Sequence, residues 1–239
     1  MQRAYAVSRL RSARRDPSRV RLEGVHALKH AVRFGAEIEV VATPDRDELE
    51  RLLTTLAPDV TLPVAPVDVD AATWATLVGR ELPSPVLAVA VRPPVAALPD
   101  LDRRGRLVVL EQPRHLGNLG AVVRVAAAAD AAGVCVIGDA DPWHPTAVRA
   151  AAGLQFALPA CGRLDTLPEL GRPLVALDPD GAALGPRTLP ADAAVVLGTE
   201  RGGLSAGLRR RADTTVRIPM RAGVSSLNLA TAAAVVLYA

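Results

Sequence analysis

The first part of the chain alternates between the apolar spacings of strands and helices. Residues 19–24 have the pattern of a short strand, and residues 25–34 carry apolar side chains at helical spacing before Gly35 ends the pattern. The same signals continue and predict, in chain order, strand 38–42, helix 45–56, strand 62–67, helix 71–78 and strand 86–91. We therefore expect an alternating α/β domain in this part.

Prolines separate this part from the rest of the chain. The pair Pro93 and Pro94 follows the last of these strands and cannot continue a helix or a central strand. We place the domain boundary just after this pair, which gives one domain over residues 1–97 and a second over residues 98–239.

The second part has the pattern of a parallel sheet. Residues 107–110 form an unbroken apolar run typical of a buried strand, and a helix over 118–131 with a strand over 134–137 completes a strand-helix-strand unit. Further strands are expected over 174–177, 194–197 and 215–218, with helices over 145–152, 204–210 and 227–238. The predicted fold class is α/β, with a mainly parallel sheet covered by helices.

Composition adds an uneven charge to this picture. Half of the 239 residues are apolar and the formal net charge is +3, but the start of the chain is strongly basic. Before residue 36, only Asp16 and Glu23 oppose the cations Arg3, Arg9, Arg11, Arg14, Arg15, Arg19, Arg21, Lys29 and Arg33. This cluster suggests a surface for a polyanion, although charge alone fits a solvated basic terminus equally well.

Several other classes of protein are disfavoured. Cys135 and Cys161 lack CxxC or metal-ligand spacing, so we expect neither a disulfide nor a zinc site, and Cys135 lies in an apolar run typical of a buried thiol. No apolar run approaches the roughly 20 residues that cross a bilayer, and the N-terminus lacks an apolar signal core. We expect a cytoplasmic protein.

Three glycine-bearing polar loops follow strands of the second domain, where open α/β sheets bind ligands. The first, residues 111–124, contains Asn118, which can cap the following helix, and Arg124, which lies in a helix otherwise rich in alanine and valine. Such an arginine needs a partner. Taken alone, it is more simply explained as a surface arginine with a snorkelling stem.

The second loop, residues 195–205, runs from an apolar strand into Gly198. Its exposed backbone could hold an adenine or amino-acid group, and Glu200 could pair with Arg124 or lie near the dipole of the next helix. By itself, this loop is more simply a glycine turn.

The third loop, residues 218–228, leads into a helix of almost unbroken apolar residues. Ser225, Ser226 and Asn228 are polar groups at the start of that helix. The simplest expectation is that Ser225 or Ser226 is its N-cap.

Together and in this order, the three loops resemble the signature of the SpoU, or TrmH-like, branch of the SPOUT methyltransferases. Residues 118–124 are similar to the first motif of that family, 197–204 to the second and 218–228 to the third. Residues 22–24 and 86–89 are also similar to the family's substrate-binding domain. The resemblance therefore extends over nearly the whole chain.

This resemblance implies an RNA ribose 2′-O-methyltransferase that uses S-adenosylmethionine and no metal. It implies a deep trefoil knot in the C-terminal α/β domain, a small L30e-like α/β domain at the N-terminus, and a homodimer. The implied cofactor-binding residues are Leu197, Gly198, Thr199, Ile218, Met220 and Leu227, and the implied catalytic residues are Arg124, Asn118, Glu200, Ser226 and Asn228. The implied RNA-binding residues are Arg9, Arg11, Arg14, Arg15 and Arg149. Ribosomal RNA is the first expected substrate and transfer RNA the second.

Arg124 is the central residue of this hypothesis. A guanidinium with a pKa above about 12 is a poor base at neutral pH, so we prefer electrostatic stabilisation of the developing 2′-alkoxide to the base role suggested by analogy. Asn118, Glu200, Ser226 and Asn228 would then orient Arg124, the cofactor or the ribose.

The sequence also departs from the family pattern. His115 and Leu116 stand where members often have Asn-Pro, and Ala151 stands where serine is common. The first change affects loop stiffness more than chemistry, while the second removes a hydroxyl. The sequence ends at Ala239 within the last expected helix, whereas relatives commonly continue somewhat further.

Two other functions compete with this interpretation. A dinucleotide-dependent oxidoreductase is suggested by the strand, the Gly117 to Gly120 turn and the helix, but the full G-x-G-x-x-G is missing and the second and third loops stay unexplained. A non-catalytic RNA-binding protein would use its arginines only to grip phosphate. Binding of S-adenosylmethionine separates these alternatives.

Overall fold

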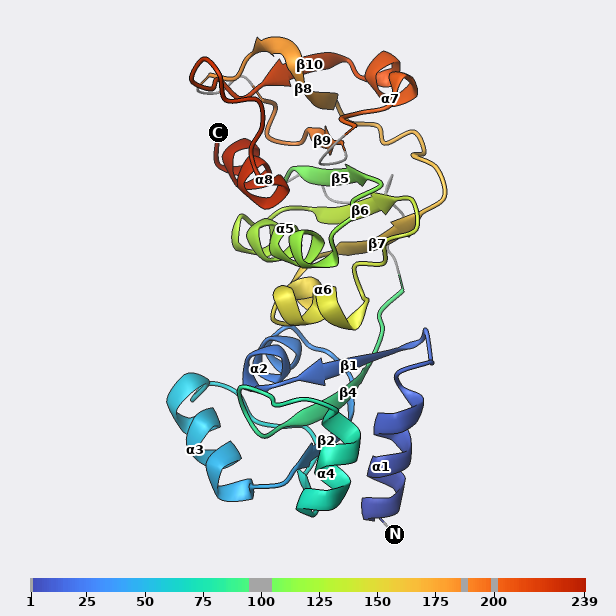
Figure 1. Ribbon diagram of the computed structural model, residues 1–239, viewed down its shortest axis with the longest axis vertical. Coiled ribbons are helices and arrows are strands. Elements are labelled where there is room, and N and C mark those ends of the chain that lie inside the picture. Colours follow the sequence, from blue (N-terminus) through green and yellow to red (C-terminus); the bar gives the residue numbers. More distant parts are fainter. Residues whose placement is uncertain (1, 95–104, 186–188, 199–201) are drawn as a thin grey trace. The chain divides into compact units, whose positions relative to one another are not determined.

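The computed structural model describes residues 2–94, 105–185, 189–198 and 202–239. The chain divides into two compact units (Figure 1). Unit 1 comprises Met1–Pro94 and Ala152–Ala157, and unit 2 comprises Val95–Ala151 and Leu158–Ala239. The expected boundary between residues 97 and 98 lies outside the described residues.

Unit 1 contains a four-stranded sheet. Its elements are α1 (Gln2–Ser12), β1 (Arg19–Glu23), α2 (Val25–Arg33), β2 (Ile38–Thr43), α3 (Arg46–Leu56), β3 (Val67–Asp68), α4 (Ala71–Val78), β4 (Leu87–Val91) and the 3₁₀ turn η2 (Leu154–Ala157). The strand order is β1-β4-β2-β3. Strand β4 pairs antiparallel with β1 and β2, and β2 pairs with β3 in parallel.

Helix α1 is an element that the sequence pattern does not predict. Its buried face consists of Ala6 and Leu10, one helical turn apart, and Ala13 is buried just beyond its end. Tyr5 is exposed on another face and Val7 is only partly buried, so the apolar side chains of α1 do not form one clear stripe. This narrow face packs into the same core cluster as strands β2 and β4.

The strand expected over residues 62–67 is wrong except at its last residue. Strand β3 contains only Val67–Asp68. Pro63 and Pro66 have no backbone N–H to donate to a ladder, which explains why regular pairing begins only after the second proline.

Residues 152–157 group with unit 1, whereas the sequence analysis assigned them to a continuous second domain. His30 Nδ1 lies 2.8 Å from the carbonyl oxygen of Ala152. A Cβ at Gly153, whose φ is +75°, would lie 2.7 Å from the carbonyl oxygen of Ala27, so this close approach requires glycine.

Unit 2 contains a six-stranded sheet in which every described pairing is parallel. Its elements are β5 (Leu107–Glu111), α5 (Leu116–Ala128), β6 (Gly133–Ile137), α6 (Pro145–Ala150), β7 (Ala160–Leu164), β8 (Leu174–Ala183), β9 (Ala194–Leu197), α7 (Ala206–Arg211), β10 (Thr214–Arg217) and α8 (Leu229–Tyr238). The strand order is β10-β8-β9-β5-β6-β7. The predicted parallel α/β sheet is confirmed, although β7 was not predicted and β8 is longer than expected.

Helices α5 and α8 pack side by side along the sheet (Figure 1). The central strands are buried from end to end, since Leu107, Val108, Val109 and Leu110 of β5 are at most 1% exposed. This continuous burial explains the unbroken apolar run in the sequence. No helix among the described residues is long and apolar enough to cross a membrane.

The strand order places the ends of β9 and β10 on the two sides of β8, with β9 ending beside the middle of β8. Leu177 of β8 pairs with Leu197 of β9, and β10 pairs with the other edge of β8. Because ligands of open α/β sheets bind beyond the carboxyl ends of the strands, this edge is the place to look for a site.

Candidate functional site

A cavity of about 400 Å³ lies at this edge of unit 2. Its size is within the roughly 300–1,000 Å³ typical of small-molecule sites. The cavity is lined by Leu177, Asp178, Pro179, Leu197, Gly198, Gly203, Arg217, Ile218, Met220, Ser225, Ser226, Leu227, Leu229 and Ala232. Its walls come from the middle of β8, from the last residue of β10, from the second and third loops of the sequence analysis, and from the start of α8.

Most of the expected cofactor-binding residues meet in this one cavity. Leu197, Gly198, Ile218, Met220 and Leu227 all line it, although the sequence separates the second and third loops. Thr199 lies outside the described residues. These residues surround the cavity with apolar side chains and with backbone that has left the strand ladder.

Gly198 is essential to the shape of this wall. A Cβ at Gly198 would lie 2.1 Å from the carbonyl carbon of Gly203 and 2.4 Å from the nitrogen of Leu204. These distances are far below van der Waals contact and involve backbone atoms. The two ends of the second loop therefore pass each other only because residue 198 has no side chain.

Glu111 anchors the second loop from the neighbouring strand. Its Oε2 accepts a hydrogen bond of 2.7 Å from the backbone N–H of Ser205. Ser205 is the N-cap of α7, and its hydroxyl accepts from the Leu208 N–H at 3.3 Å. The end of β5 thus holds the start of the helix that follows the second loop.

Asn118 and Asn228 meet between the first and third loops. The Nδ2 of Asn228 donates to the Oδ1 of Asn118 at 3.1 Å, across 110 positions of sequence. Asn228 also caps α8, because its Oδ1 accepts from the Ala230 N–H at 2.9 Å. This pair connects the starts of the two helices that pack together.

Two expected caps are therefore wrong. The N-cap of α5 is His115, which makes no side-chain capping bond, so the helix already includes Asn118. The N-cap of α8 is Asn228 rather than Ser225 or Ser226. The backbone turns helical earlier in α5 and later at α8 than the serine and asparagine preferences predict.

Arg124 is exposed on α5 and does not line the cavity. It forms no hydrogen bond or ion pair with another residue in the described ranges. Glu200, its expected partner, lies outside those ranges. Ser226 lines the cavity, but Asn118, Asn228 and Arg124 do not.

Sequence reasoning missed a buried carboxylate in the cavity wall. Asp178 is 3% exposed, and the backbone N–H of Asp180 donates to its Oδ1 at 3.1 Å. Arg209 Nε lies 2.9 Å from its Oδ2 without hydrogen-bond geometry. The position of Asp178 just after an apolar strand run is the one signal that could have indicated it.

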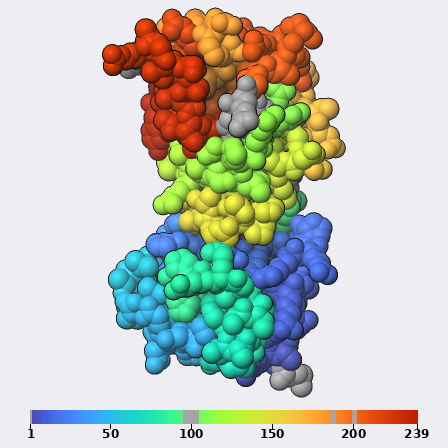
Figure 2. All heavy atoms as spheres, viewed as in Figure 1, coloured from blue at the N-terminus to red at the C-terminus, as the bar shows by residue number. Residues whose placement is uncertain are grey.

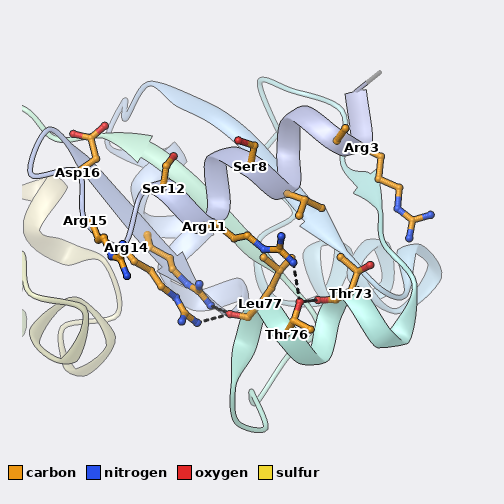
Figure 3. Close-up of a pocket in the computed structure, with 13 residues that line it drawn as sticks. Arg3, Ser8, Arg11, Ser12, Arg14, Arg15, Asp16, Thr73, Thr76 and Leu77 are labelled. Carbon is orange, nitrogen blue, oxygen red and sulfur yellow. Dashed lines mark hydrogen bonds between the residues drawn. The ribbon is translucent and has the colours of Figure 1, made fainter.

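A basic groove of about 1,250 Å³ lies between α1 and α4 in unit 1 (Figure 3). Arg11, Arg14 and Arg15 line it, as the sequence predicts for polyanion contacts. Arg11 donates to the Thr76 hydroxyl at 3.4 Å, and Arg14 donates to the Leu77 carbonyl at 2.5 Å.

Arg21 lines the same groove, although sequence reasoning did not select it. It is 4% exposed and donates through Nη2 to the Leu77 carbonyl at 2.7 Å. Its Nη1 has no hydrogen-bond partner among the described residues. Burial, and then the nearby charge of Arg14, lowers the pKa of Arg21, although a guanidinium stays charged at neutral pH.

Arg9 and Arg149 are placed differently. Arg9 is outside the groove and pairs with Glu39, whose hydrogen bond raises the pKa of Arg9. The guanidinium of Arg9, which was expected to contact RNA, is therefore paired with a carboxylate of the same unit. Arg149 is exposed in the last turn of α6, in unit 2.

Cys135 and Cys161 are both buried, and neither forms a disulfide within the described part of the chain. Burial raises the pKa of the Cys135 thiol to about 12, so this thiol is protonated and unreactive at neutral pH. Its place on β6 matches the buried thiol expected from the sequence.

Comparison with known proteins gives consistent matches. The chain is 37% identical over 177 residues to an uncharacterised tRNA/rRNA methyltransferase of Mycobacterium tuberculosis, covering 69% of this chain and 62% of that protein. It is 34% identical over 178 residues to the 23S rRNA (uridine(2479)-2′-O)-methyltransferase of Streptomyces viridochromogenes, covering 66% and 60%. The chain therefore spans less than two thirds of the length of these relatives.

The fold also has a solved counterpart. The SpoU methyltransferase AviRb from Streptomyces viridochromogenes, in complex with the cofactor AdoMet, superposes with a TM-score of 0.77 at 25% identity, covering 97% of this chain and 95% of that one. The sequence model of the SpoU rRNA Methylase family matches residues 105–238, which is more than half of the chain. The chain therefore belongs to the SpoU rRNA Methylase family.

Proposed function

We propose that this protein transfers a methyl group from S-adenosylmethionine to a ribose 2′-hydroxyl of RNA. The observation that carries this proposal is the cavity beside the middle of β8 and the ends of β9 and β10, where residues of the second and third family motifs come together. The names of relatives in the same family support this reaction class.

The cavity residues fit S-adenosylmethionine. Leu197, Ile218 and Leu227 offer apolar surface for a flat adenine ring, and the backbone beside Gly198 offers donors and acceptors for its edge. The hydroxyls of Ser225 and Ser226 and the carboxylate of Asp178 provide the polar groups that such a ligand needs for orientation. When bound, the cofactor supplies a methyl group on a positively charged sulfur.

Arg124 is the residue we assign to stabilisation of the reacting oxygen. Its guanidinium stays positively charged at neutral pH, so it lowers the energy of a developing alkoxide and cannot serve as a base. Holding two bound reactants in line supplies much of the remaining acceleration. We assign Glu200, Asn118 and Asn228 to orienting Arg124 and the ribose, and Ser226 to the cofactor side.

The basic groove of unit 1 is our candidate for the RNA backbone. Arg11, Arg14 and Arg15 present exposed guanidiniums, and buried Arg21 adds positive charge behind them. Guanidiniums bind phosphate oxygens well because their planar donors match phosphate geometry. Arg149 is proposed as a further RNA contact in unit 2, and Arg9 contributes less because Glu39 pairs with it.

Ribosomal RNA is the proposed substrate, with transfer RNA as the alternative. The named activity of the Streptomyces viridochromogenes relative supports the first choice. In this proposal the domain over residues 1–97 binds the RNA and the domain over residues 98–239 is the methyltransferase. We place the reaction in the cytoplasm, where free thiols such as Cys135 and Cys161 stay reduced.

We further propose that the methyltransferase domain has the trefoil knot of its family and that the protein is a homodimer. The final helix α8 supports a dimer, because Val235 is 37% exposed and Tyr238 is 67% exposed. The C-terminal segment, red in Figure 2, lies at the surface. Sedimentation equilibrium measures the oligomeric state, and a protein that stays monomeric at micromolar concentration contradicts the dimer.

The deciding experiment measures transfer of a labelled methyl group from S-adenosylmethionine to ribosomal RNA and, separately, to transfer RNA. We expect 2′-O-methylated nucleotide in ribosomal RNA and a loss of label with Arg124→Ala. Label in transfer RNA alone would select the alternative substrate. Tight RNA binding without transfer to either pool would favour a non-catalytic RNA-binding protein.

A further inference from the structure

The wall of the cavity contains a charged group that packing does not explain. Asp178 follows Leu177, the last residue at which β8 pairs with β9, and it is 3% exposed. Removing a carboxylate from water is costly unless hydrogen bonds or an ion pair compensate. The partners of each oxygen therefore show what this carboxylate can still bind.

One oxygen of Asp178 is satisfied and the other is not. Oδ1 accepts the 3.1 Å hydrogen bond from the Asp180 N–H. Oδ2 has the guanidinium of Arg209 at 2.9 Å, but the N–H of Arg209 is not directed at it, and no other described residue donates to it. The Arg209 side chain is 44% exposed, so water weakens this ion pair. Oδ2 thus keeps an unused acceptor position in a residue that lines the cavity, and a ligand reaches this covered oxygen when the exposed side chain of Arg209 moves aside.

The surroundings select the type of donor. Arg209 lies beside the carboxylate and would repel an approaching ammonium group. The neighbouring wall residues Leu177 and Leu197 are apolar and suit a nucleoside rather than an amino acid. A ribose hydroxyl is neutral and a good donor to a carboxylate, and dinucleotide-binding sheets hold a ribose through an acidic side chain in this way.

We propose that Asp178 is a cofactor-binding residue whose Oδ2 accepts a hydrogen bond from a ribose hydroxyl of S-adenosylmethionine. This inference rests on the proposed function, because it takes S-adenosylmethionine as the ligand of the cavity. The same contact serves the demethylated product S-adenosylhomocysteine, which keeps the ribose.

The test is a cycle of binding measurements on the full chain by isothermal titration calorimetry. The ligands are S-adenosylhomocysteine and its 2′-deoxy and 3′-deoxy analogues, and the proteins are wild type and Asp178→Asn. We expect wild type to bind one deoxy analogue roughly ten- to a hundredfold more weakly than the parent, the usual range for a hydrogen bond to a charged group. Asp178→Asn should weaken parent binding and lose most of this discrimination.

Two controls separate binding from structure. Asp180→Asn changes an exposed carboxylate two residues away and should leave affinity and discrimination unchanged. 5′-Methylthioadenosine lacks the amino-acid group, so a ribose contact predicts the same loss on Asp178→Asn for this ligand. Thermal unfolding of each variant reports whether the substitution harms the fold, and Asp178→Ala repeats the cycle with the whole carboxylate removed.

The outcomes are distinguishable. Full discrimination between parent and deoxy analogues in both Asp178 variants would overturn the proposal and leave Asp178 a structural role. Loss of the effect with 5′-methylthioadenosine would overturn the ribose contact in favour of the amino-acid end. If wild type binds none of these ligands, S-adenosylmethionine is not the ligand of the cavity and the proposed function is contradicted. If wild type binds them and the Asp178 variants bind them equally well, only the role of Asp178 is contradicted.

Discussion

The cavity of unit 2 and the groove of unit 1 are lined by residues of different character. The cavity has apolar walls and loop backbone, with Gly198 in close contact with Gly203. The groove has exposed guanidiniums from α1 and from the turn after it, beside α4 (Figure 3). Binding in the cavity should therefore depend on shape and change little with salt. Binding in the groove should depend on charge and weaken steeply with salt.

The largest expected effect on activity comes from replacing Arg124, which lines neither the cavity nor the groove. Arg124→Ala should lower the rate of methyl transfer by about 10²–10³, as loss of one electrostatic donor does in other enzymes. Arg124→Lys should recover little, because a lysine ammonium cannot reproduce planar paired donors. Affinity for S-adenosylmethionine should stay unchanged, which calorimetry measures.

Arg163 on β7 offers a matched control for this prediction. Its side chain is 48% exposed and reaches only a 3.9 Å ion pair with Asp165. Arg163→Ala should keep the full rate. Near-normal turnover in Arg124→Lys would contradict the paired-donor role of Arg124.

The next effect tests the shape of the cavity. Gly198→Ala places a methyl group against the backbone of Gly203, and overpacking of this kind costs roughly a ten- to hundredfold change in an equilibrium. We expect a corresponding loss of affinity for S-adenosylhomocysteine in calorimetry. Gly207→Ala is the control, because a Cβ there meets only the Ser205 hydroxyl at 3.7 Å. Equal affinity in both variants would show that the second loop does not shape the site.

The two units also differ in how much of their structure the sequence could predict. Strands β5, β6 and β9 are buried on both faces, so their continuous apolar runs identified the sheet, and the order of the three loops identified the family. Helix α1 escaped prediction because its buried face is only Ala6 and Leu10. With so few buried positions, and with Tyr5 exposed on another face, the apolar residues of α1 do not recur at a clear helical period.

Contacts between distant residues lay beyond sequence reasoning. The hydrogen bond between Asn118 and Asn228 depends on the packing of α5 against α8, which no local pattern encodes. Asp178 has no motif of its own, and its character comes from burial between neighbouring strands. Local preferences also misplaced the caps, since α5 begins after His115, which makes no side-chain capping bond, and α8 begins after Asn228.

A smaller effect tests the groove. Replacing both Arg11 and Arg15 by alanine should weaken RNA binding by about tenfold at physiological salt and reduce the slope of log affinity against log salt by about 0.7 for each lost phosphate contact. Arg9→Ala should change both quantities less, because Glu39 already pairs with Arg9. Fluorescence anisotropy with labelled ribosomal RNA fragments across a salt series measures these values.

Arg51→Ala is the control for nonspecific loss of charge, since Arg51 on α3 is exposed and pairs with Glu48. An Arg51→Ala effect as large as that of the double variant would mean that net charge, rather than the groove, determines RNA affinity. Unchanged cofactor affinity in the double variant would keep the two sites separate.

The smallest effect concerns the ion pairs that support α1. Glu39 accepts hydrogen bonds from Arg9 and from Arg19, the latter at 2.9 Å. Burial raises the pKa of Glu39, but these two arginines outweigh it, so the pKa lies below its ordinary value. A carboxylate with a lowered folded-state pKa contributes stability above its unfolded-state pKa and loses it as the pH falls through the folded-state pKa. Glu39→Gln should therefore lower the free energy of unfolding by about 1 kcal/mol at pH 7, with the difference from wild type shrinking below about pH 4.

Urea unfolding at several pH values measures this difference in the free energy of unfolding. Glu48→Gln, on α3, is the control and should show little change. If Glu39→Gln loses the same free energy of unfolding at every pH, the loss comes from packing rather than from the ion pairs of Glu39. The stability of α1 would then depend as little on charge as we expect of ligand binding in the cavity.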